Sequence, residues 1–270
     1  LLSAFKRENQ SAHSLPIKRN KVTGVIYLDN AATTALSPAA IQAMTKTMTV
    51  FGNPSSTHSH GREASKLLRQ AREDIAQALH TQSNKIIFTS GGTESNNTAI
   101  KGYALRHQNR GKHIVTTAIE HHAVLEVVEY LVDKFGFEAT FVQPVDCQIR
   151  AKDIKKALRP DTILVSVMAV NNETGAILPI KEISELLQEH PAAFHVDAVQ
   201  AIGKLPIYPD ELGIDFLSAS AHKFHGPKGV GFLYAKKMNF DNFMHGGDQE
   251  EKHRAGTENL ISITGMAAAL

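Results

Sequence analysis

Short apolar runs alternate with longer amphipathic patterns along most of this 270-residue chain, and this alternation limits the fold more than any other feature. Several runs are continuously apolar, which is typical of strands buried on both faces of a mostly parallel sheet. The predicted strands are Ile86–Thr89, His113–Thr117, Ala139–Val142, Thr162–Met168, Ala193–Val196, Phe216–Ala219 and Gly229–Tyr234.

Helical patterns lie between these runs. The predicted helices are Arg62–Leu79, Thr93–His107, Ala123–Phe135, Lys152–Leu158, Ile180–Glu189 and Ile261–Leu270. Strands and helices in alternation imply right-handed crossovers and a three-layer α/β/α sandwich. Ligands of such sheets bind beyond the carboxyl ends of the strands. We therefore expect the chemistry of this protein just after the apolar runs.

Charge and composition limit the function classes. The net charge is +2, and residues 1–22 contain five Lys or Arg and one Glu, so the excess is confined to a polar leader rather than to a basic face. We expect a flexible leader over residues 1–22, one large domain over 23–270, and neither a nucleic-acid-binding stripe nor a membrane span. The single cysteine, Cys147, excludes an internal disulfide and a zinc site with several thiolates, and we expect a cytoplasmic protein.

The first candidate segment follows the strand Ile86–Thr89. Two glycines, Gly91 and Gly92, allow close backbone approach to an anion, and the free amides of the helix that Thr93 opens attract phosphate. A tight turn capped by Thr93, with nothing bound, is the alternative.

Two charged residues follow other strands. Asp197 ends a buried strand, where a carboxylate is costly unless a cation, a metal or a protonated ring nitrogen pairs with it; a helix cap is the alternative. Lys223 closes a strand in a turn rich in Ser, His, Gly and Pro. Such a lysine has a lowered pKa in a partly dry pocket and forms Schiff bases, whereas a surface lysine is the alternative.

Polar residues also follow two further strands, at Asn171-Asn172 and at His121-His122. Adjacent histidines rarely converge on one metal ion, and the pair His58/His60 adds no clear ligand spacing. One interpretation unites the segments. A phosphate cradle, an Asp for a ring nitrogen, a Schiff-base Lys and a stacking or acid–base His are what pyridoxal 5′-phosphate (PLP) requires.

Ordered motifs along residues 26–270 resemble the cysteine desulfurases of the NifS/IscS type, in the class V aminotransferase family of PLP-dependent fold type I proteins. These motifs are Tyr27–Thr34, Gly52–Ser56, Thr89–Ser95, Val170–Glu173, His195–Ala198, Ser220–Lys223, Met244–Gly247 and Arg254–Asn259.

The resemblance implies a role for each matching residue. Lys223 is expected to form the Schiff base with PLP, Asp197 to pair with the pyridine nitrogen and His121 to stack on the ring. Asn172 and Gln200 would bond the ring substituents. The phosphate would be bound by Gly92, Thr93, Ser220 and His222, and by Thr257 of a neighbouring subunit, which implies a homodimer. Asn30–Thr33 would lie along the substrate site.

The implied activity converts L-cysteine to L-alanine. Lys223 would remove the Cα proton, His121 would handle the proton of the substrate thiol, and an enzyme cysteine would receive the sulfur as a persulfide. An acceptor protein would take it onward for iron–sulfur cluster assembly, tRNA thiolation or cofactor synthesis. In the family the cysteine nucleophile and the arginine for the substrate carboxylate lie in a C-terminal region beyond Leu270, and Cys147 is expected to be an incidental loop residue.

We therefore expect a fragment without the C-terminal small domain, which cannot turn over persulfide efficiently by itself. Three alternatives remain open: a selenocysteine lyase or other class V enzyme, a non-catalytic scaffold, and a zinc hydrolase built on the histidines. The presence of Lys223 and Asp197 argues against the scaffold.

Overall fold

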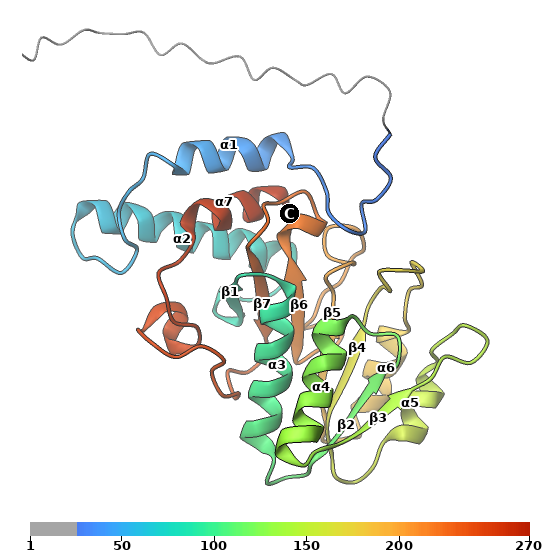
Figure 1. Cartoon of the computed structure of the whole chain (residues 1–270). Coiled ribbons are helices and arrows are strands. Elements are labelled where there is room, and N and C mark those ends of the chain that lie inside the picture. Colours follow the sequence, from blue (N-terminus) through green and yellow to red (C-terminus); the bar gives the residue numbers. More distant parts are fainter. Residues whose placement is uncertain (1–25) are drawn as a thin grey trace, which may run out of the picture.

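A seven-stranded sheet forms the centre of the computed structural model, which describes residues 26–270 (Figure 1). The strand order is β1-β7-β6-β5-β4-β2-β3. The strands are β1 Ile86–Thr89, β2 His113–Thr117, β3 Glu138–Val142, β4 Thr162–Met168, β5 Ala193–Asp197, β6 Phe216–Ser220 and β7 Gly231–Ala235. The predicted leader over residues 1–22 lies outside the described residues.

Only β7 runs against the other strands. Its pairings with β1 and with β6 are antiparallel, whereas β3, β2, β4, β5 and β6 pair in parallel in that order. Because β1 and β6 both oppose β7, β1 runs in the same direction as the parallel strands. The carboxyl ends of six strands therefore meet at one edge of the sheet. The predicted sheet, mostly parallel, is confirmed.

Helices cover both faces of this sheet (Figure 1). The helices are α1 Pro38–Thr47, α2 Ser59–Ala78, α3 Gly92–His107, α4 His122–Phe135, α5 Ala151–Ala157, α6 Ile180–Leu187 and α7 Leu260–Ala269, with short 3-10 helices η1 Ser83–Lys85, η2 Ala221–Lys223 and η3 Gln249–Lys252. None of the helices in residues 26–270 is both long enough and apolar enough to cross a membrane.

Alternate strand residues supply two separate cores. Ile87 packs with α3 and α4 in one cluster, whereas Ile86 and Phe88 pack with α2, α5, α6 and α7 in the other. Successive strand side chains point to opposite faces, so a run of apolar residues serves both cores. This is why the strands appear in the sequence as continuous apolar runs, and it confirms the three-layer sandwich.

The predicted elements begin and end within three residues of the observed ones, but α1 was not predicted. This helix starts after Ser37, whose hydroxyl accepts the backbone N–H of Ala40 at 3.0 Å, with Pro38 in its first position. Only Ala40 and Thr47 of α1 are buried, so its sequence has little apolar periodicity. Its position depends on packing against α7 rather than on a pattern of its own.

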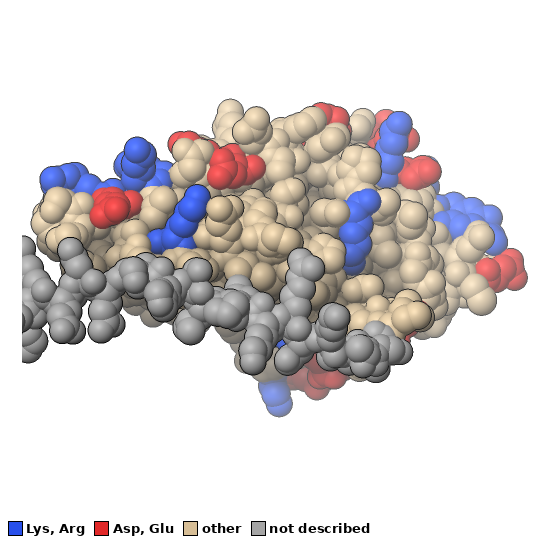
Figure 2. All heavy atoms as spheres, turned by 90° about the horizontal axis from the view of Figure 1, so that it is seen from above, with Lys and Arg blue, Asp and Glu red and all other residues tan. Residues whose placement is uncertain are grey.

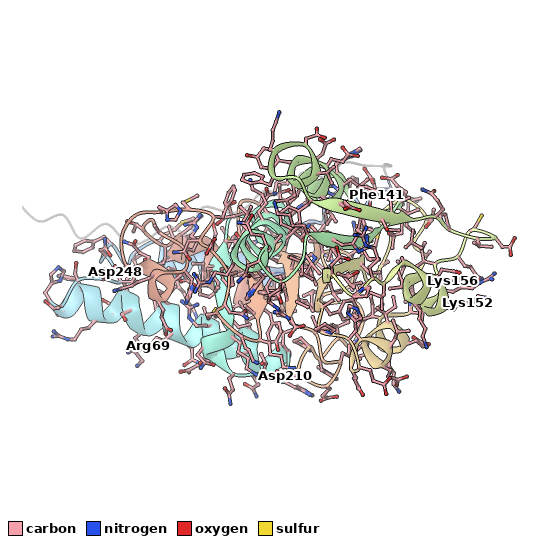
Figure 3. All side chains as sticks on the ribbon, turned by 90° about the horizontal axis from the view of Figure 1, so that it is seen from below. Arg69, Phe141, Lys152, Lys156, Asp210 and Asp248 are labelled. Atoms are coloured by element: carbon pink, nitrogen blue, oxygen red, sulfur yellow. The ribbon has the colours of Figure 1, made fainter. Side chains whose placement is uncertain are left out.

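An ionic cluster on the underside connects the turn after α2 to β7. Asp210, labelled in Figure 3, accepts hydrogen bonds from Lys85 Nζ at 2.7 Å and from the Tyr234 hydroxyl at 2.8 Å, and a further one from the Thr81 hydroxyl. On the face seen from above, Lys and Arg are interspersed with Asp and Glu, and the visible part of residues 26–270 shows no continuous basic stripe (Figure 2).

Candidate active site

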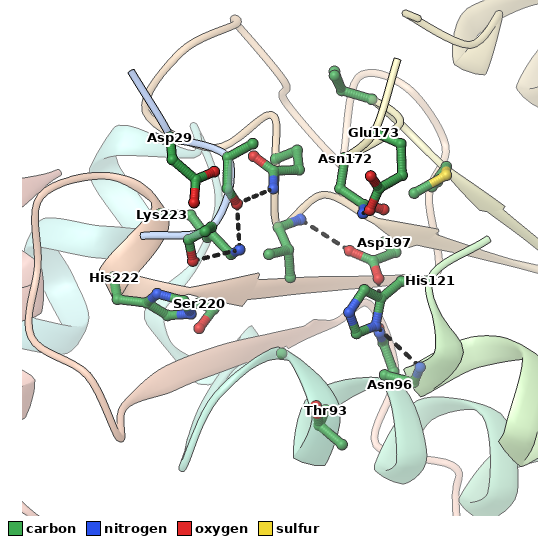
Figure 4. A pocket seen from close by; sticks show the side chains of 18 residues that line it. Asp29, Thr93, Asn96, His121, Asn172, Glu173, Asp197, Ser220, His222 and Lys223 are labelled. Atoms are coloured by element: carbon green, nitrogen blue, oxygen red, sulfur yellow. Dashed lines mark hydrogen bonds between the residues drawn. The ribbon is translucent and has the colours of Figure 1, made fainter. Parts of the chain in front are cut away.

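A cavity of about 430 Å³ opens at the edge where the parallel strands end. Its walls come from the loops after β1, β2, β4, β5 and β6 and from the N-terminal segment around Ala31 (Figure 4). Nine of the ten predicted site residues line it: Gly92, Thr93, His121, Asn172, Asp197, Gln200, Ser220, His222 and Lys223. The sheet topology thus brings together residues that are separated by more than a hundred positions in the chain.

The turn between β1 and α3, residues Ser90 to Thr93, is called the cradle below. Gly91 has a φ of 151°, a conformation that favours glycine, and a Cβ at Gly92 would lie 2.6 Å from Val199 Cγ2. The helix begins at Gly92 and its N-cap is Gly91, which has no side chain to cap it. The predicted capping role of Thr93 in the alternative is therefore wrong. The first amides of a helix have no partners within it, and Gly92 and Thr93 at the start of α3 line the cavity, as an anion site requires.

Asp197 is buried at the end of β5, with 5% of its surface exposed. Its carboxylate accepts the Asn96 side-chain amide at 2.7 Å and the backbone N–H of Val199 at 3.0 Å. Burial raises the pKa of Asp197, and neither of these neutral donors fully offsets the loss of water. The residues after it form turns rather than a helix, so Asp197 does not cap a helix.

Lys223 lies in η2, directly after β6, and is half-buried. Its Nζ donates to the carbonyl oxygens of Ala31 and Ala32, the latter at 2.9 Å. Burial lowers the pKa of Lys223, while the carboxylates of Asp197 and Asp29 oppose that shift. A lysine with a lowered pKa has a larger fraction of neutral amine, which is the form that attacks a carbonyl group.

Gln200 extends the contact with the N-terminal segment. Its side-chain amide donates to Ala31 O at 2.8 Å, and its carbonyl oxygen accepts from Lys204 Nζ at 2.9 Å. Lys223 and Gln200 therefore share one backbone acceptor. The predicted segment Asn30–Thr33 lies against the lysine, and Ala31 and Ala32 line the cavity.

His121 is the N-cap of α4, where its Nδ1 accepts the backbone N–H of Ala123 at 3.0 Å. A neutral His121 consequently bears its proton on Nε2. Figure 4 shows its ring beside Asp197 in the cavity. The ring is thus held from one side by a backbone bond, and its other nitrogen is available to a ligand.

The remaining predicted residues occupy the rim. His222 Nδ1 lies 3.1 Å from the Thr33 hydroxyl, and burial lowers the pKa of His222. Asn172 donates to Glu173 Oε1 at 2.6 Å. Thr257 does not line the cavity: it is exposed in the loop between η3 and α7.

Three polar residues of the cavity were given no role by the sequence analysis: Asn96, Asp29 and Glu173. Asn96 lies one helical turn after Gly92, so its position on the cavity side of α3 follows from the period of the helix. Beneath the cavity, Glu120 is fully buried and accepts from the Thr117 hydroxyl at 2.6 Å and from Met168 N at 2.9 Å. Burial raises the pKa of Glu120 to about 8.

The other candidates lie apart from this cavity. Cys147 is exposed in the turn between β3 and α5, where it lines a different groove. His58 caps α2, accepting from Gly61 N at 3.3 Å. Within residues 26–270 no three His, Cys, Asp or Glu side chains are grouped as metal ligands would be.

The fold matches that of the large domain of PLP-dependent transferases. Within that class the chain belongs to the class-V aminotransferase family, which matches residues 26–270.

Similar curated relatives of this chain are named as cysteine desulfurases. The chain is 53% identical over 249 residues to the cysteine desulfurase IscS of Dictyoglomus turgidum, covering 91% of this chain and 63% of that protein. It is 49% identical over 248 residues to the cysteine desulfurase IscS of Methanosarcina thermophila, covering 90% and 61%. The chain thus spans less than two thirds of the length of these relatives.

Solved structures agree. A structure described as SspA in complex with cysteine superposes with a TM-score of 0.87 at 38% identity, covering 91% of this chain and 72% of that one. A NifS-like protein gives a TM-score of 0.87 at 41% identity, covering 90% and 68%. The resemblance to NifS/IscS-type proteins is therefore confirmed.

Proteins of this family depend on PLP, and the cavity fits that cofactor. A Cβ at Gly92 would lie 2.6 Å from Val199 Cγ2, and a glycine there lets the backbone approach a phosphate closely. Asp197 is buried in the cavity wall and accepts hydrogen bonds only from the neutral groups of Asn96 and Val199, so a protonated pyridine nitrogen would supply a cationic partner. Lys223 lies in the same cavity, and its amine donates to backbone carbonyl oxygens rather than to a carboxylate.

Proposed function

We propose that this chain is the PLP-binding part of a cysteine desulfurase, which converts L-cysteine to L-alanine. The proposal depends above all on Lys223 and Asp197 facing one cavity with the cradle beside them. The names of the relatives support the substrate class. In this proposal residues 23–270 form the cofactor domain, and residues 1–22 are a leader to it.

The proposed roles are those that the family resemblance implies for these residues, and the residues line one cavity. Asp197 would pair with the pyridine nitrogen, His121 would stack on the ring, and Asn172 and Gln200 would bond the ring substituents. Gly92, Thr93, Ser220 and His222 would hold the phosphate. When bound, PLP supplies an electron-accepting ring that stabilises charge at the substrate Cα.

Two groups of the chain would move protons. Lys223 Nζ, which donates to two backbone carbonyl oxygens, would take the proton from the substrate Cα. His121 Nε2 would exchange a proton with the substrate thiol, because its Nδ1 is occupied by Ala123 N. The carbonyls of Ala31 and Ala32 would orient the amine of Lys223 between these events.

Sulfur transfer is assigned to a thiol other than Cys147, since Cys147 lines another groove. We further propose a homodimer in which Thr257 reaches the cradle of the neighbouring subunit, supported by its exposed loop position. A cytoplasmic setting and a sulfur-acceptor protein, serving iron–sulfur cluster assembly or thiolation of tRNA or cofactors, complete the proposal.

Saturation with PLP followed by borohydride reduction tests the proposal. We expect a visible absorption band and a covalent adduct at residue 223, both absent from Lys223→Ala. A matched control, Lys237→Ala, alters an exposed lysine after β7 and should retain the adduct. A colourless protein without an adduct would refute the cofactor site. Alanine release from cysteine, compared with release from selenocysteine, then tests the substrate.

A further inference from the structure

An ion pair joins the first turn of α3 to the loop before α7. Arg254 Nε lies 2.9 Å from Glu94 Oε1, and Arg254 Nη2 lies 3.3 Å from Glu94 Oε2. The two side chains are 21% and 7% exposed. Glu94 Oε2 also accepts the backbone N–H of Ser90 at 2.8 Å, so the pair contacts the backbone of the cradle itself.

The carboxylate of this pair lies beside an anion site. A second cavity, of about 360 Å³, borders the cradle and is lined by Glu94 together with His222 and Lys228. Burial favours the neutral form of Glu94, but the hydrogen bonds from Arg254 and Ser90 hold its pKa below the ordinary value. Glu94 is therefore a carboxylate at neutral pH, and it would repel a phosphate if no cation compensated it.

We propose that Arg254 is a positioning residue for phosphate binding, which neutralises Glu94 beside the cradle and holds the cradle and the loop of Thr257 in one arrangement. The inference rests on the proposed function, because it takes the phosphate of PLP as the bound group. It adds to that function a specific source of affinity for the phosphorylated form of the vitamin over pyridoxal.

The chain contains a matched pair for comparison. Arg72 Nη2 lies 2.6 Å from Glu250 Oε1, and the Glu250 side chain is 2% exposed. Glu250 also accepts a backbone N–H, from Phe88 at 2.8 Å. This second pair has the same chemistry and similar burial, but neither residue lines the two cavities. It separates the effect of losing a buried ion pair from the effect of changing the charge at the cradle.

The decisive experiment measures the dissociation constants of PLP and of pyridoxal for the cofactor-free chain by absorbance titration. In Arg254→Gln the unpaired carboxylate should weaken PLP binding about tenfold, whereas pyridoxal binding should change less than about twofold. Glu94→Gln/Arg254→Gln, which removes both charges, should restore the ratio of the two constants to within about twofold of the unaltered chain.

The two single variants should change PLP affinity in opposite directions, which distinguishes this role from a merely structural one. Glu94→Gln alone should bind PLP as well as the unaltered chain does, or better, because it leaves a cation beside the cradle. This variant decides the question if Arg254→Gln does not fold. Arg72→Gln should lower the unfolding temperature and leave the PLP-to-pyridoxal ratio unchanged.

Three results would overturn the inference: equal weakening of both ligands in Arg254→Gln, no recovery in the double variant, or preferential loss of PLP in Glu94→Gln. A change in the ratio as large in Arg72→Gln would also contradict it. If the unaltered chain binds neither ligand, the proposed function fails as well. If the unaltered chain binds both ligands but Arg254→Gln does not change the ratio of the PLP and pyridoxal dissociation constants, the inference alone fails.

Discussion

Asp197 and Asp210 are both carboxylates that connect separate segments, but their partners differ in charge. Asp210 accepts from Lys85, Thr81 and Tyr234, and although burial would raise its pKa, these hydrogen bonds bring the pKa below the ordinary value of 3.8. Asp197 accepts from neutral amides alone, and burial raises its pKa.

We propose that this contrast distinguishes a carboxylate that stabilises the fold from one that binds a ligand. On the underside of the molecule, where Figure 3 labels Asp210, the fold supplies the cation itself as Lys85, so the ion pair is complete without a ligand. At the carboxyl edge the fold places a carboxylate without a cation and lets it face a cavity (Figure 4). We propose that a buried carboxylate whose hydrogen-bond donors are all neutral marks the position of a cationic group of the ligand.

The largest expected effect comes from making the same substitution in both regions. Asp197→Asn should weaken PLP binding about 100-fold, because a buried hydrogen-bonded ion pair with the ring nitrogen is lost. The cofactor-free variant should unfold at the same urea concentration as the unaltered chain or a higher one. Asp210→Asn is the control, with unchanged PLP affinity. Equal losses of affinity in both variants would break the comparison.

A second prediction concerns Glu120, the carboxyl beneath the cavity, whose raised pKa of about 8 is due first to burial. A raised folded-state pKa contributes stability below the ordinary value of 4.5 that is lost as the pH rises through about 8. Glu120→Gln keeps an acceptor for Thr117 and Met168. As the pH rises from 4.5 to about 8, the Glu120→Gln variant should gain about 2 kcal/mol of unfolding free energy relative to the unaltered chain.

Urea unfolding of the cofactor-free chain at pH 5 and pH 8 checks this prediction. Glu126→Gln is the control, because the Glu126 side chain is 72% exposed on α4, and it should shift stability by less than about 0.5 kcal/mol at either pH. A difference between Glu120→Gln and the unaltered chain that does not grow with pH would show that Glu120 is already ionised.

Asp210→Asn should cost about 1–2 kcal/mol at pH 7, because an acceptor of three hydrogen bonds loses its charge and one donor is left poorly paired. The stability contributed by Asp210 changes with pH in the direction opposite to that contributed by Glu120. A lowered pKa stabilises the folded state above the ordinary value of 3.8, and this stability is lost as the pH falls. Denaturant unfolding at pH 3.5 should therefore show a smaller cost than at pH 7.

The smallest effect is expected outside both regions, at α1. Ser37→Ala removes the hydroxyl that accepts the Ala40 N–H and should cost about 1 kcal/mol of unfolding free energy, without affecting PLP binding. Ser37→Asp, which retains a capping oxygen, should recover most of that stability. A loss of PLP affinity in Ser37→Ala would link α1 to the cavity and contradict this separation.

Much of the site was predictable because its residues follow strands. Asp197, Ser220 and Lys223 come at or just after the ends of β5 and β6, and parallel strands place such ends at one edge. Thr257 stays a prediction, since it lies outside the cavity in an exposed loop. Asn96 was not recognised because a polar residue inside a helix has many common explanations, and only its 2.7 Å contact with Asp197 reveals its place.

Local pattern alone determined the strands, most of the helices and the edge where the chemistry lies, because hydrophobic periodicity and turn residues act over a few positions. The tertiary structure decided the antiparallel course of β7, the position of α1 and the pairing of Arg254 with Glu94 across 160 residues. These depend on which surfaces and charges meet after the chain has folded. No short-range pattern encodes such a meeting, so the sequence could not predict that Asp197 and Asp210 have opposite pKa shifts.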